Sequence, residues 1–575
     1  MRATTVLVAL MLSVSAGFAV QERFAVVVRG GTVYDGTGAP GRKADVGIRG
    51  DRIAAVGDLS KAEAGRVVDA MGFAVSPGFI NMLSWATDSL IADGRSMSDL
   101  KQGVTLEIFG EGWSMGPLTD AMKKEAKSNQ GDIKYDITWT TLGEYLDQLV
   151  ARGISPNVAS FVGATTLRIH ELGYADRAPT PEELARMEEL VRQAMREGAL
   201  GVGASLIYAP AFYAKPDELL ALTNAAAESG GGYIAHMRSE ANRLVEATDE
   251  LIGIARDAKV HGEIYHMKAA GQPNWPKMAE VIARVEAARA AGVSVSANMY
   301  TYVAGATGLD AAMPPWVQEG GLDAWVKRLE DPAIRARVIG EMRTPTDDWE
   351  NLGMMAGSPD RIKFIGFKTD KLKPLTGMTL AQVMKQRGTS AEDTMIDLVI
   401  EDHTRIETAY FLMSEDNVKL GIKQPWVAFG SDAESSAPEG VFLKSSTHPR
   451  AYGNVARLLG RYVRDEKVIT LPDAIRRLTR LPADNWKLKN RGCLDVGCYA
   501  DLVVFDPAKM KDHATFEKPQ QYAAGVRDVF VNGVQVLRNG KHTGEKPGRV
   551  VRGPGWRGAD AAGATSKRIP DVAME

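Results

Sequence analysis

Two histidines of the chain stand where a catalytic metal ion could be bound. His236 ends the apolar segment GGYIAH, and His266 follows the apolar segment GEIY, so both come at the end of a predicted strand. Because the carboxyl ends of parallel strands meet at one rim of a barrel, both imidazoles are expected in the same mouth. Such imidazoles can bind zinc, although either histidine alone could be a structural residue.

A catalytic zinc ion needs three protein ligands and an open position for water. Glu111 is the candidate third ligand, because it follows the predicted strand GVTLEIF within FGEGWS, where glycines let the backbone turn sharply. Glu107 is a rival inside that strand, and Glu111 could also be a solvated loop residue. Cys493 and Cys498 form no CxxC motif, which excludes a cysteine-rich zinc site. The histidines in helical or loop segments are His170, His261, His403, His513 and His542.

A base is also required to activate water. Asp432 ends the segment WVAFGSD, which is predicted to be the last strand of the barrel. There it could take a proton from a metal-bound water and deliver it to a leaving nitrogen. It could equally be a capping or turn aspartate.

Three further residues could bind a carboxylate or a polarised carbonyl. Arg450, which follows a His-Pro pair, offers a bidentate fork that lysine cannot match. Lys268 comes shortly after the second strand-end histidine, and Tyr208 ends the predicted strand GVGASLIY. A purely structural role is an open alternative for each of the three.

These residues need a scaffold that brings strand ends together. Between 76 and 491, apolar strand patterns alternate with helical patterns such as those at 240–258 and 276–291. Repeated units of about 30 residues predict parallel strands with right-handed crossovers, and therefore an α/β fold of the (β/α)8 TIM-barrel type rather than an open sheet. From about 303 to 375 the pattern is poor, and we expect an insertion over the barrel mouth.

Both ends of the chain have a sequence pattern that differs from that of the middle. Short apolar runs separated by glycine and Asn-Gly turns occupy 24–75 and 492–552. They predict one small β-sandwich domain built from both termini. Cys493 and Cys498 flank a short glycine-containing segment there and could form a disulfide or be two buried thiols.

The overall composition is that of a globular protein. The 575 residues include 69 basic and 72 acidic side chains, a net charge of -3, with 45% hydrophobic and 25% charged residues. These values exclude wholesale disorder, a collagen-like chain and a coiled-coil rod. The near-neutral charge gives no reason to expect nucleic acid or an anionic membrane as a partner, and it leaves the oligomeric state open.

The first residues have the pattern of a targeting signal. Residues 1–19 combine Arg2, an apolar run and small residues at Gly17 and Ala19, the pattern of a Sec signal peptide. The run is short for a transmembrane helix, and an uncleaved anchor is the alternative. We therefore expect export, to a periplasm, with no membrane attachment after cleavage.

A series of motifs runs through the chain in a fixed order. They are VVRGGTVYDGTG, PGFI, QGVTLEIFGEGWSMGP, GALGVGASLIYAPAFYA, YIAHMRSE, YHMKAAG, VSANMYTY, GSD, HPRAYG, NRGCLDVGCYADLVVFDP and HTGEKPGRVVRG. Together they resemble the amidohydrolase superfamily, in particular the N-acyl-D-amino-acid deacylase (D-aminoacylase) group, over roughly residues 26–552. In many members a metal-binding cysteine stands where this chain has Glu111.

The resemblance implies a barrel with a β-sandwich assembled from both ends. It implies a zinc site and an acid/base, formed by Glu111, His236 and His266 as ligands with Asp432 beside them. It also implies a set of substrate-binding residues, namely Arg450, Lys268 and Tyr208, with Tyr300 and Tyr302 lining the pocket.

One departure from the superfamily pattern concerns the metal. The usual sequence after PGFID is an HxH pair, but here PGFINMLSWA places Leu83 and Trp85 at those positions. Leucine has no donor atom, and an indole N–H cannot ligate zinc. The second metal position should therefore be empty, with one zinc ion per chain. Since the tightly held metal of the D-aminoacylase group is the other one, catalysis could survive.

Three functions follow from these residues. The first is zinc-dependent hydrolysis of N-acyl amino acids to a carboxylate and a free amino acid, with the D preference resting on the resemblance alone. The second is a zinc hydrolase of dipeptides or cyclic amides. The third is an exported binding protein that is catalytically silent because the HxH pair is missing.

Overall fold

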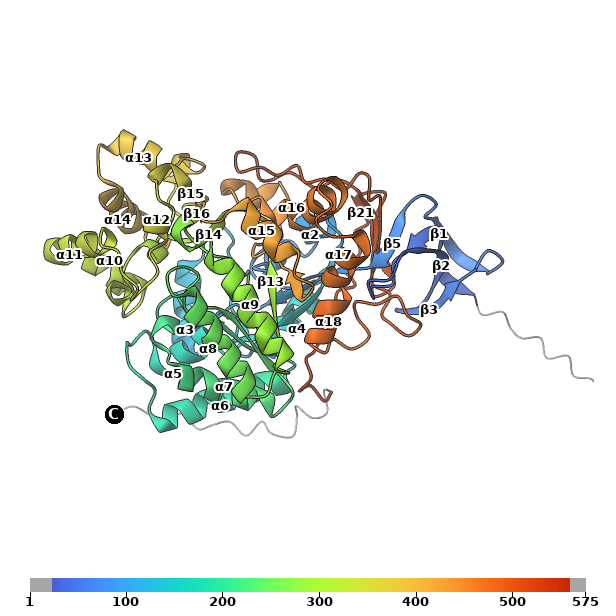
Figure 1. Cartoon of the computed structure of the whole chain (residues 1–575), viewed down its shortest axis with the longest axis horizontal. Coiled ribbons are helices and arrows are strands. Elements are labelled where there is room, and N and C mark those ends of the chain that lie inside the picture. Colours follow the sequence, from blue (N-terminus) through green and yellow to red (C-terminus); the bar gives the residue numbers. More distant parts are fainter. Residues whose placement is uncertain (1–22, 559–575) are drawn as a thin grey trace, which may run out of the picture.

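The computed structural model describes residues 23–558. The predicted signal peptide at 1–19 lies outside this range. Figure 1 shows three parts: a barrel in the centre, a β domain made from the two ends of the described chain, and a helical insertion on the opposite side. The predicted α/β fold, a (β/α)8 barrel with a small β domain built from both termini, is confirmed.

The described barrel has eight strands around its axis, with β8 and β9 counted as one interrupted strand. Parallel pairing joins them in the order β6 to β7 to β8, and β9 to β10, β11, β12, β13 and β17. Their bounds are β6 Phe79–Asn81, β7 Val104–Phe109, β8 Asn157–Ser160 continued by β9 Val162–Gly163, β10 Gly201–Ser205, β11 Gly232–His236, β12 Gly262–Ile264, β13 Val295–Met299 and β17 Val427–Phe429. The first and last positions meet where Met82 N donates to Phe429 O at 3.1 Å.

Helices between the strands cover the outside of the barrel. They are α4 Leu142–Arg152, α5 Ala164–Leu172, α6 Pro181–Arg196, α7 Pro216–Ala227, α8 Leu244–Asp257, α9 Lys277–Ala290, α15 Glu415–Ile422 and α17 Leu471–Leu478. Helix α6 shows why these segments are helical. Thr180 and Glu183 form a capping box at its start, and Met187, Val191 and Met195 form the buried face.

The barrel strands are buried on both faces, which is why they read as continuous apolar runs. The interior of the barrel is filled by side chains that include Leu106, Ile108, Phe161 and Tyr265, and Trp486 packs against Phe161 at a ring distance of 4.5 Å. Reaction chemistry is therefore expected at the rim where the strands end.

The β domain joins the two ends of the chain. Its strands are β1 Phe24–Val33, β2 Arg42–Arg49, β3 Arg52–Gly57, β4 Ala64–Asp69, β5 Ala74–Pro77, β18 Leu502–Phe505, β19 Val526–Val531, β20 Val534–Arg538 and β21 Lys541–His542. They form one nine-stranded sheet in which β5 pairs with β18. Cys493 and Cys498 are disulfide-bonded and lie in the core of this domain.

The insertion is larger than the predicted segment at about 303–375. Its small sheet pairs β14 Gly305–Gly308 and β15 Ile362–Phe364 with β16 Glu407–Tyr410, which is the central strand. Its helices are α10 Leu322–Glu330, α11 Pro332–Met342, α12 Leu352–Met355, α13 Leu380–Arg387 and α14 Ala391–Asp402. These elements share a hydrophobic core of their own. The boundary is set by the pairing of Gly305 with Tyr410, which no local pattern reveals.

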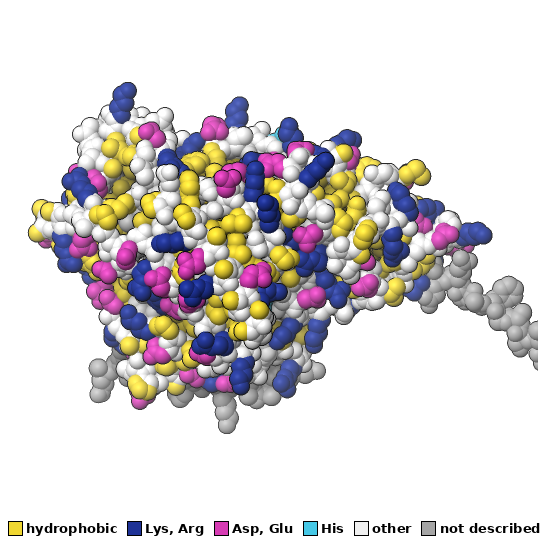
Figure 2. All heavy atoms as spheres, in the orientation of Figure 1, with side chains coloured by type: hydrophobic (Ala, Val, Ile, Leu, Met, Phe, Trp, Pro, Cys, Tyr) yellow, Lys and Arg dark blue, Asp and Glu magenta, His cyan; other side chains and the backbone are white. Residues whose placement is uncertain are grey.

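The surface agrees with the near-neutral charge. Figure 2 shows lysine and arginine side chains interspersed with aspartate and glutamate over the visible face, without a broad area of one sign. Among the described helices, none combines the length and apolar character that a membrane crossing requires.

Candidate active site

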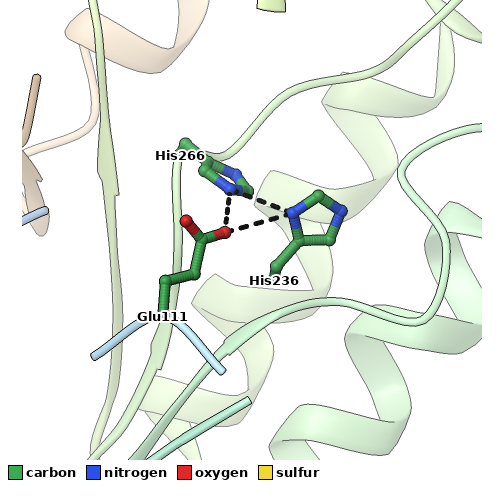
Figure 3. A group of neighbouring side chains, drawn as sticks. All are labelled: Glu111, His236 and His266. Carbon is green, nitrogen blue, oxygen red and sulfur yellow. Dashed lines mark hydrogen bonds and ion pairs between the residues drawn. The ribbon is translucent and has the colours of Figure 1, made fainter. Parts of the chain in front are cut away.

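The three predicted metal ligands converge at the rim of the barrel. Glu111 follows β7, His236 ends β11 and His266 follows β12. Glu111 Oε1 lies 2.6 Å from His266 Nε2 and 3.2 Å from His236 Nδ1, and the two nitrogens are 3.1 Å apart. In Figure 3 the three side chains point toward one another from separate strands. All three are buried.

Unusual backbone conformations direct these side chains inward. Glu111 stands between Gly110 and Gly112, whose φ angles are +106° and +70°. A Cβ on Gly110 would lie 2.4 Å from the Phe161 carbonyl oxygen, so this close approach requires glycine. His266 also has a positive φ of 34°, although it is not glycine. Such conformations cost free energy and are typical of functional sites.

Glu240 lies behind both imidazoles, and the sequence analysis missed it. Its Oε1 lies 3.0 Å from His266 Nδ1, and its Oε2 lies 3.6 Å from His236 Nε2. Carboxylates in this position orient histidine ligands and increase their basicity. The available signal was its place four residues after His236 in HMRSE.

Lys268 is bound within the same group. Its Nζ lies 2.6 Å from Glu240 Oε1 and 2.7 Å from His266 Nδ1, and the residue is only 7% exposed. Lys268 therefore neutralises Glu240 in this structure. Its predicted contact with substrate stays a prediction.

The charges of the cluster are strongly coupled. Burial raises the pKa of Glu111, but His266 and His236 more than offset this and lower it to about 2. Burial and Lys268 lower the pKa of His266, but the surrounding carboxylates, Glu111 first, outweigh them and raise it to about 9. Without a metal ion, a proton on His266 therefore balances the carboxylates.

This donor set fits zinc. One carboxylate oxygen and two imidazole nitrogens lie within 4.8 Å of one another, and the outer imidazole nitrogens face Glu240. Three protein donors of this type are the pattern of a catalytic zinc site that keeps one open position. Glu107, the rival ligand, instead accepts hydrogen bonds from Ser84 at 2.7 Å and from Ser96.

Asp432 lies next to the cluster, as the strand-end argument predicts. It follows β17, has a positive φ of 52° and is buried. Its Oδ2 forms a 2.8 Å ion pair with Arg450 Nη1. Burial raises the pKa of Asp432, and Arg450 opposes part of that rise. A buried carboxyl with a raised pKa is suited to both accepting and donating a proton.

The Trp85 indole joins Asp432 to the metal ligands. Its Nε1 donates to Glu111 Oε2 at 3.2 Å and to Asp432 Oδ1 at 3.1 Å. Leu83, two residues earlier, is completely buried in the barrel interior. The space between the two carboxylates is therefore bridged by an N–H group.

The three predicted tyrosines have different surroundings. The Tyr208 ring lies 5.3 Å from the His236 ring, and burial raises its pKa well above the usual value, which keeps its hydroxyl protonated. Tyr300 lies under the Arg450 guanidinium at 4.5 Å, and in the described part of the chain its hydroxyl has no hydrogen-bond partner. Tyr302 turns its hydroxyl toward Asp512, at 3.4 Å. Of the three tyrosines, Tyr208 thus lies next to a predicted metal ligand and Tyr300 next to Arg450.

The chain belongs to the amidohydrolase family, whose sequence profile it matches over residues 66–537. Among its relatives, the D-aminoacylase of Alcaligenes xylosoxydans xylosoxydans is 34% identical over 531 residues, which cover 92% of this chain and 98% of the relative. The N-acyl-D-glutamate deacylase of the same organism is 32% identical over 548 residues, covering 95% and 99% of the two chains.

Solved structures give the same grouping. A D-aminoacylase described as having a binuclear metal centre superposes with a TM-score of 0.77 at 33% identity, covering 92% of this chain and all of that one. The N-acyl-D-glutamate deacylase of Bordetella bronchiseptica, in complex with zinc and a phosphonate that mimics the tetrahedral intermediate, has a TM-score of 0.75 at 29% identity over the same shares.

Zinc binding is expected to depend strongly on pH, because the metal must displace the proton of His266. Since the pKa of His266 is raised to about 9, zinc affinity should rise about tenfold per pH unit for each displaced proton below that value and then level off. Competition with a chromophoric chelator measures this. A flat affinity between about pH 6 and pH 8 would exclude His266 as a ligand.

Glu107→Gln is the matched control for Glu111→Gln. Each variant converts one buried carboxylate near the end of the same strand to its amide, but only Glu111 faces the imidazoles. We expect Glu111→Gln to weaken zinc affinity by more than about a hundredfold, and Glu107→Gln to keep both the affinity and its pH dependence.

Proposed function

We propose that this chain is a zinc-dependent hydrolase that cleaves the amide bond of N-acyl-D-amino acids, releasing a carboxylate and a free amino acid. The observation that carries the proposal is the convergence of Glu111, His236 and His266 at the barrel rim beside Asp432 and Arg450. The relatives named above are a D-aminoacylase and deacylases of N-acyl-D-amino acids. The preference for D substrates is taken from them.

The residues divide the reaction between them. When bound, zinc lowers the pKa of a water molecule toward about 7 and polarises the amide carbonyl. Asp432 takes the proton of the attacking water and then delivers it to the departing nitrogen. The protonated Tyr208 beside His236 is placed to donate to the developing oxyanion.

Arg450 binds the α-carboxylate of the substrate in this proposal. It is 3% exposed, stacks on Tyr300, and uses one arm of its fork for Asp432. Its Nε has no hydrogen-bond partner in the described part of the chain. A substrate α-carboxylate bound there would place the scissile amide next to Asp432 and would favour N-acyl amino acids over dipeptides and cyclic amides.

Replacing Asp432 tests the mechanism. Asp432→Asn should keep zinc and lower kcat on N-acetyl-D-amino acids by about 10²–10⁴-fold, because the acid/base is lost while the ligands remain. Turnover should be measured on N-acetyl-D- and N-acetyl-L-amino acids, dipeptides and hydantoins, with zinc content measured in parallel.

Wild-type turnover by Asp432→Asn would refute the acid/base role. Preferred turnover of dipeptides or hydantoins would instead assign another amide substrate. A zinc-loaded chain that turns over none of these compounds would be the silent binding protein.

We further propose that the site holds one zinc ion per chain. Leu83 and Trp85 offer no metal donor, and the Trp85 N–H already bridges Glu111 and Asp432. In this arrangement the indole restrains Asp432 and occupies the approach to a second metal position.

The double variant Leu83→His/Trp85→His should raise the metal content from about one to about two zinc ions per chain, because it adds two imidazoles beside these carboxylates. Metal analysis after dialysis against zinc measures the ratio. Leu83→Ala/Trp85→Phe, which removes the N–H without adding a donor, should stay at about one. Two zinc ions in the unaltered chain would contradict the proposal.

Export is proposed from residues 1–19 and is supported by the Cys493–Cys498 disulfide, a bond that persists in oxidising compartments. Mass spectrometry of the protein recovered from a periplasmic fraction should find a chain that begins at Val20. An intact Met1 in a cytoplasmic fraction would contradict export.

A further inference from the structure

A hollow of about 220 Å³ opens beside Asp432 and Arg450. The insertion contributes Glu407 on β16, and the segment after β17 contributes Glu434, two residues beyond Asp432. Asp88, which follows β6, completes the wall on the barrel side. The hollow is therefore continuous with the residues assigned to proton transfer and carboxylate binding.

The charges in the hollow do not balance. Arg450 is the only lysine or arginine among its described lining residues, and it is paired with Asp432. Asp132, a further lining residue, is paired with Lys373 at 2.7 Å.

Within the described residues, three acidic residues of the hollow form no ion pair with a cation, although Arg450 acts electrostatically on Glu407. Asp88 accepts a hydrogen bond from the Tyr135 hydroxyl at 2.8 Å. For Glu407 and Glu434, no side-chain hydrogen bond or ion pair occurs within the described residues, although solvent in the hollow reaches both.

Without a bound cation, keeping these neighbouring carboxylates ionised costs free energy. Glu407 and Glu434 are exposed to the solvent of the hollow, and Asp88 is half-buried. Partial desolvation raises the pKa of Glu434, and repulsion from Glu407 and Asp88 adds to the rise. Desolvation also raises the pKa of Asp88, opposed by hydrogen bonds with Tyr135 and Thr87. It raises the pKa of Glu407 as well, opposed by Arg450.

The spacing of these carboxylates is not that of a compact metal site. Among the described residues, the carboxylates of the hollow do not form a group of three within 4.8 Å, unlike the Glu111 cluster. An organic cation on a flexible arm can reach groups that a single metal ion cannot bridge. A separate observation concerns Arg450, which is buried at the wall of the same hollow. Its Nε has no hydrogen-bond partner among the described residues, which indicates a place for a carboxylate of the same ligand.

We infer that the hollow binds the side chain of a basic amino acid, so that the preferred substrates are N-acyl derivatives of lysine-, ornithine- or arginine-type amino acids. The α-carboxylate lies on Arg450, and the side-chain cation lies among Glu434, Glu407 and Asp88. This inference rests on the proposed function and specifies the substrate class of the same site.

Binding is tested separately from turnover. Calorimetry on the zinc-loaded Asp432→Asn variant compares N-acetyl-D-lysine with N-acetyl-D-norleucine, which has a similar length and no charge, and with N-acetyl-D-glutamate. We expect the lysine derivative to bind at least about tenfold more tightly than norleucine, and glutamate to bind more weakly than both. Equal or tighter binding of norleucine would overturn the inference.

Adding Glu407→Gln/Glu434→Gln to this variant should reduce the lysine-to-norleucine preference to near one. The control Glu182→Gln/Glu189→Gln removes the same charge from the exposed face of α6 and should leave the preference unchanged. A preference that survives the hollow variant, or that is lost equally in the control, would also overturn the inference.

Kinetics of the wild-type, zinc-loaded chain test the proposed function and the basic-substrate inference separately. Turnover of N-acetyl-D-lysine and N-acetyl-D-norleucine at equal kcat/KM would leave the proposed function standing and refute the basic-substrate inference. Tight, charge-dependent binding of N-acetyl-D-lysine without hydrolysis of any N-acyl amino acid would support the hollow's role and refute the proposed function.

Discussion

The carboxylate of Glu111 is the point on which the rest of the site depends. One oxygen faces the imidazoles of His236 and His266, and the other accepts the indole N–H of Trp85. Four strand ends, those of β6, β7, β11 and β12, are thereby tied to one functional group. The two flanking glycines and the left-handed backbone of His266 are the conformational cost of this convergence.

The barrel and the insertion have different tasks around that group. The barrel supplies the proposed metal ligands, the proposed acid/base and Glu240 behind the imidazoles, all on short segments at or just after the ends of buried strands. The insertion supplies Glu407 to the hollow and Arg405, whose guanidinium lies 4.9 Å above the Tyr208 ring. The repeating part of the architecture thus positions the groups proposed for the chemistry, while the insertion lines the space beside them.

His236, His266, Glu111 and Asp432 could be placed from the sequence, because parallel strands with a repeating spacing bring their ends to one rim. The roles of Glu240 and Trp85 could not be predicted in this way. Their roles depend on how the loops after β11 and β6 return across the rim, and sequence spacing does not encode that path. The end of the insertion was set too early for a related reason, since β14 pairs with a strand about a hundred residues later. Lys268 was expected to face substrate, but its neutralising partner became visible only in three dimensions.

The pairing of β5 with β18 has a consequence for the order of synthesis. The sheet formed by the first five strands lacks its neighbouring strand until Leu502–Phe505 has been made. The segment beyond these residues crosses the barrel, where Val551 N donates to Val158 O and Gly553 N donates to Gly198 O, each at 2.8 Å. The edge of β5 therefore stays unpaired until this late segment of the chain is available. A truncation before Leu502 would leave that edge open to aggregation.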